Sequence, residues 1–164
     1  MEYFEIVDVL ARKVLTVSGN PTVEVEITLD DGSVGRASVP GDMKNSAPVE
    51  IAVENVNIEL AEALMAMNAI EQKSVDRLML EIDGSENASR LGANAIMACS
   101  LACAKAAAFS SGLTLYNYIG GVGAGSIPEL CEDIDSLALC NYATLSQYIE
   151  AASREHADGK NVTL

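Results

Sequence analysis

The sequence predicts an α+β fold: a three-stranded antiparallel β-meander, a bundle of helices, and a short helical extension at the C-terminal end. Three observations support this prediction. Apolar and polar residues alternate before residue 40, apolar residues recur about every 3.6 positions after residue 50, and residues 91–113 contain a single charge. A chain of 164 residues has room for one domain of ordinary size and an appendage.

The first elements are predicted strands. Residues 22–29, TVEVEITL, alternate apolar and polar side chains, which is typical of a strand with one buried face. The Asp31-Gly32 pair predicts a tight two-residue turn, and residues 34–39 then resume the alternation as the second strand of a hairpin. Residues 4–14 also have strand composition, so a meander of three strands is the simplest arrangement.

Helices are predicted to follow the strands. Apolar side chains recur at steps of three and four between residues 50 and 67, which indicates an amphipathic helix. A second helical stretch is expected from Asn68 to a stop at Asp83-Gly84. Residues 91–113 suggest either a membrane span or a core helix, and their alanine content together with Lys105 favours the core helix.

The stretch GGVGAGS at residues 120–126 is typical of a linker. It does not match a phosphate-binding loop, because no Lys-Ser or Lys-Thr follows it and its glycines lack the GxGxxG spacing. We therefore divide the chain into a domain at residues 1–121, a glycine-rich linker at 122–126 and a helical extension at 127–164.

The charge balance argues against two classes of partner. Ten Lys and Arg against 24 Asp and Glu give a formal net charge of -14, which repels nucleic acids and anionic membrane surfaces. We therefore expect no nucleic acid and no membrane as a partner. The N-terminal segment has acids inside its apolar run and no basic region, so it does not resemble a secretory signal, and a cytoplasmic location is predicted.

The four cysteines are predicted to be free thiols. Cys99 and Cys103 lie one helical turn apart in an alanine-rich segment, where small hydrophobic side chains are expected. Cys131 and Cys140 lack the CxxC spacing of a zinc or redox site.

No metal site is predicted either. The single histidine, His156, stands alone in a polar stretch. Glu132, Asp133 and Asp135 could in principle form a cluster of oxygen ligands, but in a chain this acidic we interpret them as a solvated face.

Three stretches together resemble the enolase (phosphopyruvate hydratase) family. SGNPTVEVEITLDDGSVGRASVP, at residues 18–40, resembles the family's N-terminal hairpin, and AVENVN, at 52–57, resembles the start of its first helix. SRLGANAIMACSLACAKAAA followed by GLTLYNYIGG resembles its buried helix and the end of its N-terminal domain. The resemblance spans residues 3–121 and implies the small α+β cap of an enolase.

The resemblance also implies where an enolase keeps its chemistry. In that family the cap precedes a modified α/β barrel, which supplies the acidic magnesium ligands, the catalytic lysine and the phosphate-binding groups. Such a barrel needs about 250 residues. Only 43 residues follow Gly121 in this sequence, so we expect no barrel within it.

Two departures from the family pattern bear on function. The resemblance implies a mobile loop, Ser-Gly-Ala-Ser-Thr-Gly, after the hairpin, one of whose serines helps bind the second magnesium. This chain instead reads GDMKNSAPVE after Pro40, with Ser46 as its only hydroxyl, which predicts a short strand-to-helix connection. Thr16, Val17 and Ser18 replace the usual Asp-Ser-Arg, which puts the enolase type of dimer in doubt.

We therefore expect a non-catalytic enolase-like domain, a pseudoenzyme or interaction module with no catalytic, cofactor-binding or metal-binding residues. A homo-oligomer or a protein partner is expected to cover its apolar face, and residues 127–152 are expected either to fold back onto the domain or to exchange with a second copy.

Two alternatives remain. In the first alternative, the chain is a subunit or remnant of a phosphopyruvate hydratase that takes its barrel from another chain. Only in that case would Mg²⁺ be a cofactor, for the dehydration of 2-phosphoglycerate. A shortened form of a longer enzyme is disfavoured, because shortening at the ends would not remove an internal loop.

Overall fold

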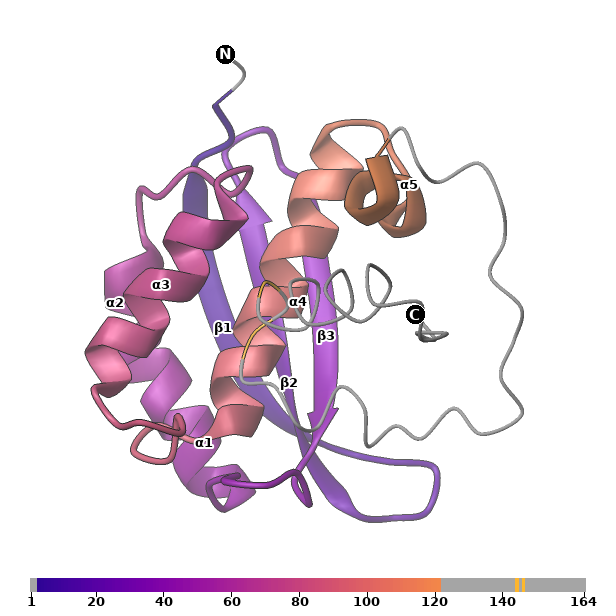
Figure 1. Ribbon diagram of the computed structural model, residues 1–164. Coiled ribbons are helices and arrows are strands. Elements are labelled where there is room, and N and C mark those ends of the chain that lie inside the picture. Colours follow the sequence, from indigo (N-terminus) through magenta and orange to yellow (C-terminus); the bar gives the residue numbers. More distant parts are fainter. Residues whose placement is uncertain (1–2, 122–143, 145, 147–164) are drawn as a thin grey trace, which may run out of the picture.

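The computed structural model describes residues 3–121 and, beyond them, Thr144 and Ser146. The elements in chain order are β1 (Ile6–Leu15), β2 (Pro21–Leu29), β3 (Val34–Pro40), α1 (Val49–Asn55), η1 (Val56–Leu60), α2 (Ala61–Leu64), α3 (Gln72–Asp83), α4 (Ala93–Ser110) and α5 (Leu115–Gly120). The strands form one antiparallel sheet in the order β1-β2-β3, and the helices pack against it (Figure 1). The predicted α+β arrangement, a meander followed by helices, is confirmed.

The turn between β2 and β3 is longer than the predicted two-residue reversal. The Leu29 N–H donates to the Ser33 carbonyl at 2.9 Å, so residues 30–32 form a three-residue loop. A two-residue type I′ turn needs positive φ at both central residues, whereas Gly32 has a φ of 83° and Asp31 is not in that region. Asp31 instead accepts the Ser33 N–H through its carboxylate at 2.8 Å, which holds the turn closed.

The predicted amphipathic helix is present as α1, η1 and α2, which run without interruption from Val49 to Leu64. Its middle segment, η1, is a single π-helical turn. The buried side chains include Ala52, Val56 and Leu60, each fully inaccessible, which pack toward the sheet. The three- and four-residue steps of the sequence thus correspond to a real buried stripe.

On η1, Asn57 contacts the outer edge of the sheet. Its Oδ1 accepts the Ala11 N–H at 2.7 Å, and its Nδ2 donates to the Ala11 carbonyl at 3.1 Å. Because β1 is at the edge of the sheet, these backbone groups have no partner strand on that side among the residues that the structure describes. One side-chain amide thus pairs with them as a neighbouring peptide group would.

Helix α3 begins later than the sequence predicts, at Gln72 and not at Asn68. The side chain of Asn68 accepts the Phe4 N–H at 3.1 Å, and its backbone forms a β-bridge with Glu5, so this residue extends the sheet contact. The end of the helix is as predicted: Gly84 adopts a left-handed φ of 66° and its N–H donates to the Leu80 carbonyl.

Helix α4 is the centre of the domain, as predicted, and lies across β2 and β3 (Figure 1). By length and composition it could cross a membrane, but 78% of that segment is buried inside the domain, as in the core helix of a globular domain. Its alanines allow a very close approach. A Cβ added at Gly35 of β3 would lie only 2.0 Å from the Ala102 carbonyl oxygen.

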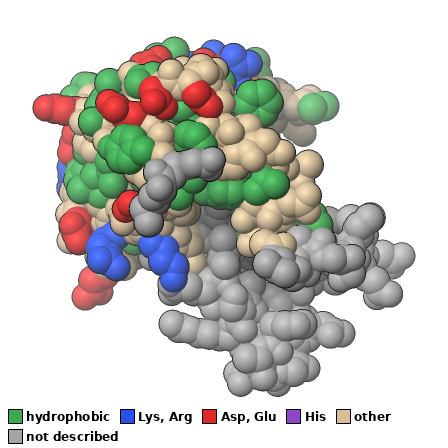
Figure 2. All heavy atoms as spheres, turned by 90° about the horizontal axis from the view of Figure 1, so that it is seen from above, with side chains coloured by type: hydrophobic (Ala, Val, Ile, Leu, Met, Phe, Trp, Pro, Cys, Tyr) green, Lys and Arg blue, Asp and Glu red, His purple; other side chains and the backbone are tan. Residues whose placement is uncertain are grey.

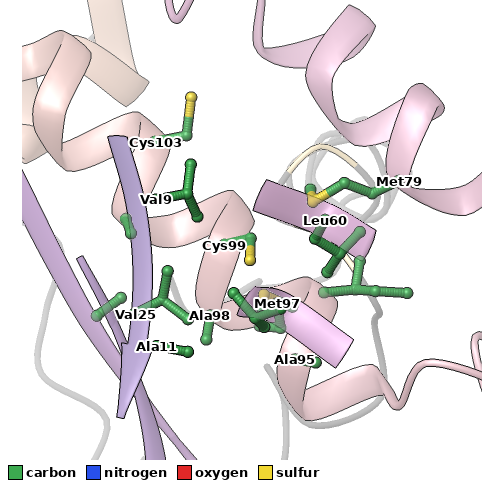
Figure 3. Packing of buried hydrophobic residues seen from close by; sticks show 14 of the residues in the cluster. Val9, Ala11, Val25, Leu60, Met79, Ala95, Met97, Ala98, Cys99 and Cys103 are labelled. Atoms are coloured by element: carbon green, nitrogen blue, oxygen red, sulfur yellow. The ribbon is translucent and has the colours of Figure 1, made fainter. Parts of the chain in front are cut away.

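Both thiols of α4 are buried and free, as predicted. Figure 3 shows Cys99 among apolar side chains, near Met97 and Leu60. Burial raises the pKa of the Cys99 thiol. Burial is also the larger cause for Cys103, and together with the nearby Asp76 charge it raises the pKa of that thiol to about 12. Since the thiolate is the reactive form, both side chains are chemically inert in the folded domain.

We expect Cys99 and Cys103 to resist alkylation by maleimide at mildly alkaline pH while the protein is folded, and to react completely in concentrated guanidinium chloride. Peptide mapping by mass spectrometry would assign the label to each cysteine. Labelling of either residue at the rate of a free cysteine under native conditions would contradict the buried core.

The last described helix, α5, begins after Thr114, whose hydroxyl accepts the Asn117 N–H at 3.3 Å as an N-cap. The predicted linker at 122–126 lies outside the described residues, and so does the predicted extension apart from Thr144 and Ser146. The same holds for Cys131, Cys140, His156 and the acids Glu132, Asp133 and Asp135, for which the predictions stay as they are.

Candidate functional site

The connection from β3 to α1, residues 41–48, lies where the family resemblance implies a mobile catalytic loop. It passes directly into α1, with Pro48 as the N-cap residue and Glu50 in the first turn. A carboxylate at that position interacts favourably with the positive end of the helix. The predicted short strand-to-helix connection is therefore what the structure contains.

A buried asparagine holds this connection in place. The Asn94 side chain, fully inaccessible in α4, accepts the Ala47 N–H through Oδ1 at 3.0 Å and donates from Nδ2 to the Ala47 carbonyl at 3.0 Å. The Asn45 carbonyl accepts the Ala93 N–H, also at 3.0 Å. Three hydrogen bonds thus join the connection to the first turn of the central helix.

The connection is also closely packed against the start of α4. A Cβ added at Gly92 would lie 2.6 Å from the Ala47 Cβ, so the two backbones touch only because Gly92 has no side chain. Met43 is 5% exposed and belongs to the hydrophobic core. Residues 43–47 are thus anchored in the core and are not a free surface loop.

Ser46, the hydroxyl that the sequence offers in place of the family's serine motif, faces inward. Its Oγ is closed off from solvent and has no hydrogen-bond partner among the described residues. Its backbone N–H donates to the Met43 carbonyl at 3.1 Å. The side chain is therefore not presented to a ligand in solution.

Next to the connection lies an open hollow of about 940 Å³. One wall is the turn between β1 and β2, and the other is the connection itself with the start of α1. The polar residues that line it are Thr16, Ser18, Asn20, Asp42, Lys44, Ser46 and Glu50. The hollow thus combines hydroxyls with charges of both signs.

The carboxylate of Glu50 in this hollow is a weak base. Lys13 Nζ lies 2.5 Å from Glu50 Oε1, and this hydrogen bond lowers the pKa of Glu50 below its ordinary value. Abstraction of a proton from carbon needs a base with a pKa nearer to neutrality. Glu50 is poorly suited to that task.

The hollow also does not fit the magnesium ion that an enolase reaction requires. Mg²⁺ prefers several oxygen ligands in octahedral geometry. The Ser46 hydroxyl is turned inward, and across residues 3–121, 144 and 146 no group of three His, Cys, Asp or Glu side chains is arranged to hold a metal ion. The donor set at this place therefore does not match the family's magnesium chemistry.

The acidic character of the chain is visible at the surface. Figure 2 shows acidic side chains as separate groups among hydrophobic and polar ones on the face seen from above Figure 1. Part of the negative charge is paired, as where Arg90 binds the Glu59 carboxylate through two nitrogens at 2.9 and 3.1 Å. Exposed pairs of this kind contribute little to stability.

Sequence reasoning missed the role of Asn94, which lies within residues 91–113, the segment predicted as a core helix. A usable signal was present: an asparagine in the first turn of an otherwise apolar segment, two positions after Gly92. Buried amides require partners, and at a helix start those partners are often backbone groups of an adjoining loop.

Comparison with known families agrees with the α+β fold. The chain matches the sequence model of the family described as "Enolase, N-terminal domain" over residues 41–119. The match begins at the connection and runs through α1 to α5, while the hairpin stretch at residues 18–40 precedes it. The chain therefore contains an enolase N-terminal domain.

Proposed function

We propose that this enolase N-terminal domain is non-catalytic and works as an interaction module. The observation that supports the proposal is the anchored β3–α1 connection. A catalytic lid has to open and close over substrate, which requires a segment with few buried contacts. Here the segment is hydrogen-bonded through Ala47 in both directions to a buried side chain.

The chemistry of the adjoining hollow supports the same proposal. Ser46 is turned inward, and the pKa of Glu50 is lowered by Lys13, so neither side chain suits metal binding or proton abstraction. The alternative, a cap that completes an enolase barrel supplied by another chain, requires a serine-bearing lid at this place. The connection offers neither the length nor an accessible hydroxyl for one.

An assay of 2-phosphoglycerate dehydration tests the proposal. The full chain is mixed with the barrel portion of an enolase, with Mg²⁺ present, and formation of the enol product is followed by its ultraviolet absorbance. We expect no rate above that of the barrel alone. The matched control is the cap of the same enolase added in place of this chain, which must raise the rate for the assay to be valid.

A rate increase that depends on the concentration of this chain would overturn the proposal and favour the split-enzyme alternative. In that case Ser46→Ala would separate two explanations. Loss of the gain would assign the magnesium-binding role to Ser46, and an unchanged gain would mean that the domain completes the barrel without a lid.

A further inference from the structure

Asp76 is a buried carboxylate at the contact between α3 and α4. Its side chain belongs to a residue only 2% exposed. One oxygen, Oδ1, accepts from Gln72 Nε2 at 2.9 Å and from Ser100 Oγ at 2.7 Å. Those two donors belong to the domain itself, and they fix the orientation of the carboxylate.

The second oxygen of Asp76 points to a different part of the chain. Oδ2 accepts the backbone N–H of Ser146 at 3.0 Å, across 70 positions of sequence. Thr144, two residues earlier, is fully inaccessible. A buried carboxylate is costly in free energy unless its oxygens accept hydrogen bonds. The hydrogen bond from the Ser146 N–H therefore stabilises the buried Asp76 side chain.

We propose that Asp76 is the docking point at which the chain beyond Gly121 returns to the domain, with the segment at Thr144 and Ser146 as an intramolecular ligand of the α3–α4 contact. This inference goes beyond the proposed function and rests on the hydrogen bond between Ser146 and Asp76. Its test reads hydrogen exchange and not activity, so the two proposals can fail separately.

The docking is intramolecular. A chain as long as residues 122–143 can span up to roughly 75 Å when extended, whereas a domain of this size is roughly 35 Å across. Covalent length therefore permits Ser146 to reach Asp76 of its own domain. Attachment through the chain also gives the segment a high effective concentration, which favours binding in the same molecule over exchange with a second copy.

Asp76→Asn is the informative substitution in the domain. An asparagine has one carbonyl oxygen and one NH₂ group in place of two oxygens. If the oxygen keeps the two donors Gln72 and Ser100, the NH₂ group faces the Ser146 N–H, and two donors cannot pair. The substitution thus removes the contact with Ser146 while it preserves the size of the side chain and its contacts within the domain.

A second pair of variants leaves the domain untouched. Ser146→Pro removes the backbone N–H and with it the donor to Asp76. Ser146→Ala keeps the N–H and changes only the side chain, so it is the matched control. A folding defect in Asp76→Asn therefore does not leave the proposal without a test.

The measurement is backbone amide hydrogen exchange at Thr144 in the full chain, read by mass spectrometry or NMR. We expect exchange at Thr144 in the wild type and in Ser146→Ala to be slower than in a free peptide of the same sequence by at least about tenfold. Thr144 is fully inaccessible while the segment is docked, and the hydrogen bond from the Ser146 N–H to the charged Asp76 stabilises docking by at least that order. In Asp76→Asn and Ser146→Pro we expect the peptide rate to return.

Two results would overturn the proposal. One is exchange at the peptide rate in the wild type, and the other is full protection in Ser146→Pro. The same measurement after serial dilution tests the intramolecular mode: protection that stays constant supports it, and protection that falls with concentration means that a second copy supplies the segment, which contradicts docking within one chain.

Discussion

Replacing Asn94 with Ala is expected to lower the free energy of unfolding by about 2–4 kcal/mol, since it leaves a buried N–H and a buried carbonyl of Ala47 without partners. Both groups lie in a position that is 9% exposed, where water has little access to replace the lost amide. The cost therefore exceeds that of a typical surface substitution. Denaturant unfolding monitored by circular dichroism measures this change in the free energy of unfolding.

Asn117→Ala is the matched control for this prediction. Asn117 is an exposed asparagine in α5, and its loss is expected to change stability by less than about 0.5 kcal/mol. Equal stability of Asn94→Ala and Asn117→Ala would mean that the connection is not held by Asn94. It would also remove the observation on which the proposed loss of a catalytic lid rests.

Gly35→Ala is expected to destabilise the domain by at least about 3 kcal/mol, at the upper end of the range for an overpacked core. The added methyl group would meet two backbone atoms of α4, the Ala102 carbonyl oxygen at 2.0 Å and the Ala106 nitrogen at 2.4 Å. A flexible side chain could move aside, but a helix backbone can do so only by shifting away from the sheet. Thermal unfolding compares the variant with the wild type.

Ser38→Ala on the same strand serves as the control, because Ser38 is exposed and its hydroxyl donates to the partly buried Glu24 carboxylate. We expect a change within about 0.5 kcal/mol there. Unfolding of Gly35→Ala at the same temperature as Ser38→Ala would contradict the close approach of α4 to β3 at Gly35.

Much of the fold could be predicted because its signals are local. The alternation at residues 22–29 predicted a strand, and the three- and four-residue steps from residue 50 predicted the helix that runs from Val49 to Leu64. The near absence of charge in residues 91–113 predicted the buried α4. In each case the residues that form the element also encode its burial.

The errors arise where a distant contact decides the local structure. Asn68 precedes a stretch with helical periodicity, but its side-chain amide binds the backbone of Phe4, 64 positions earlier, and α3 begins only at Gln72. The turn at Asp31 was predicted from a residue pair that favours a two-residue loop, and the Asp31 carboxylate instead closes a three-residue loop through Ser33. Local propensity is a weak guide against such contacts.

The candidate site was predictable in outline only. The sequence indicated a short connection with Pro48 near the start of the helix, because length and proline position are visible in the letters. Its attachment to Asn94 was not predictable, since the two partners lie 47 positions apart. The contact of Asp76 with Ser146 spans an even longer separation.

The pairing of Asn57 with Ala11 also affects how molecules meet one another. An exposed edge strand offers its free N–H and C=O groups to any other extended chain, and this is a common route to aggregation. Asn57 occupies both backbone groups of Ala11 in the middle of β1. A strand from another molecule that added along β1 would first have to displace the Asn57 amide. Asn57 therefore protects the edge of the sheet against extension by another chain.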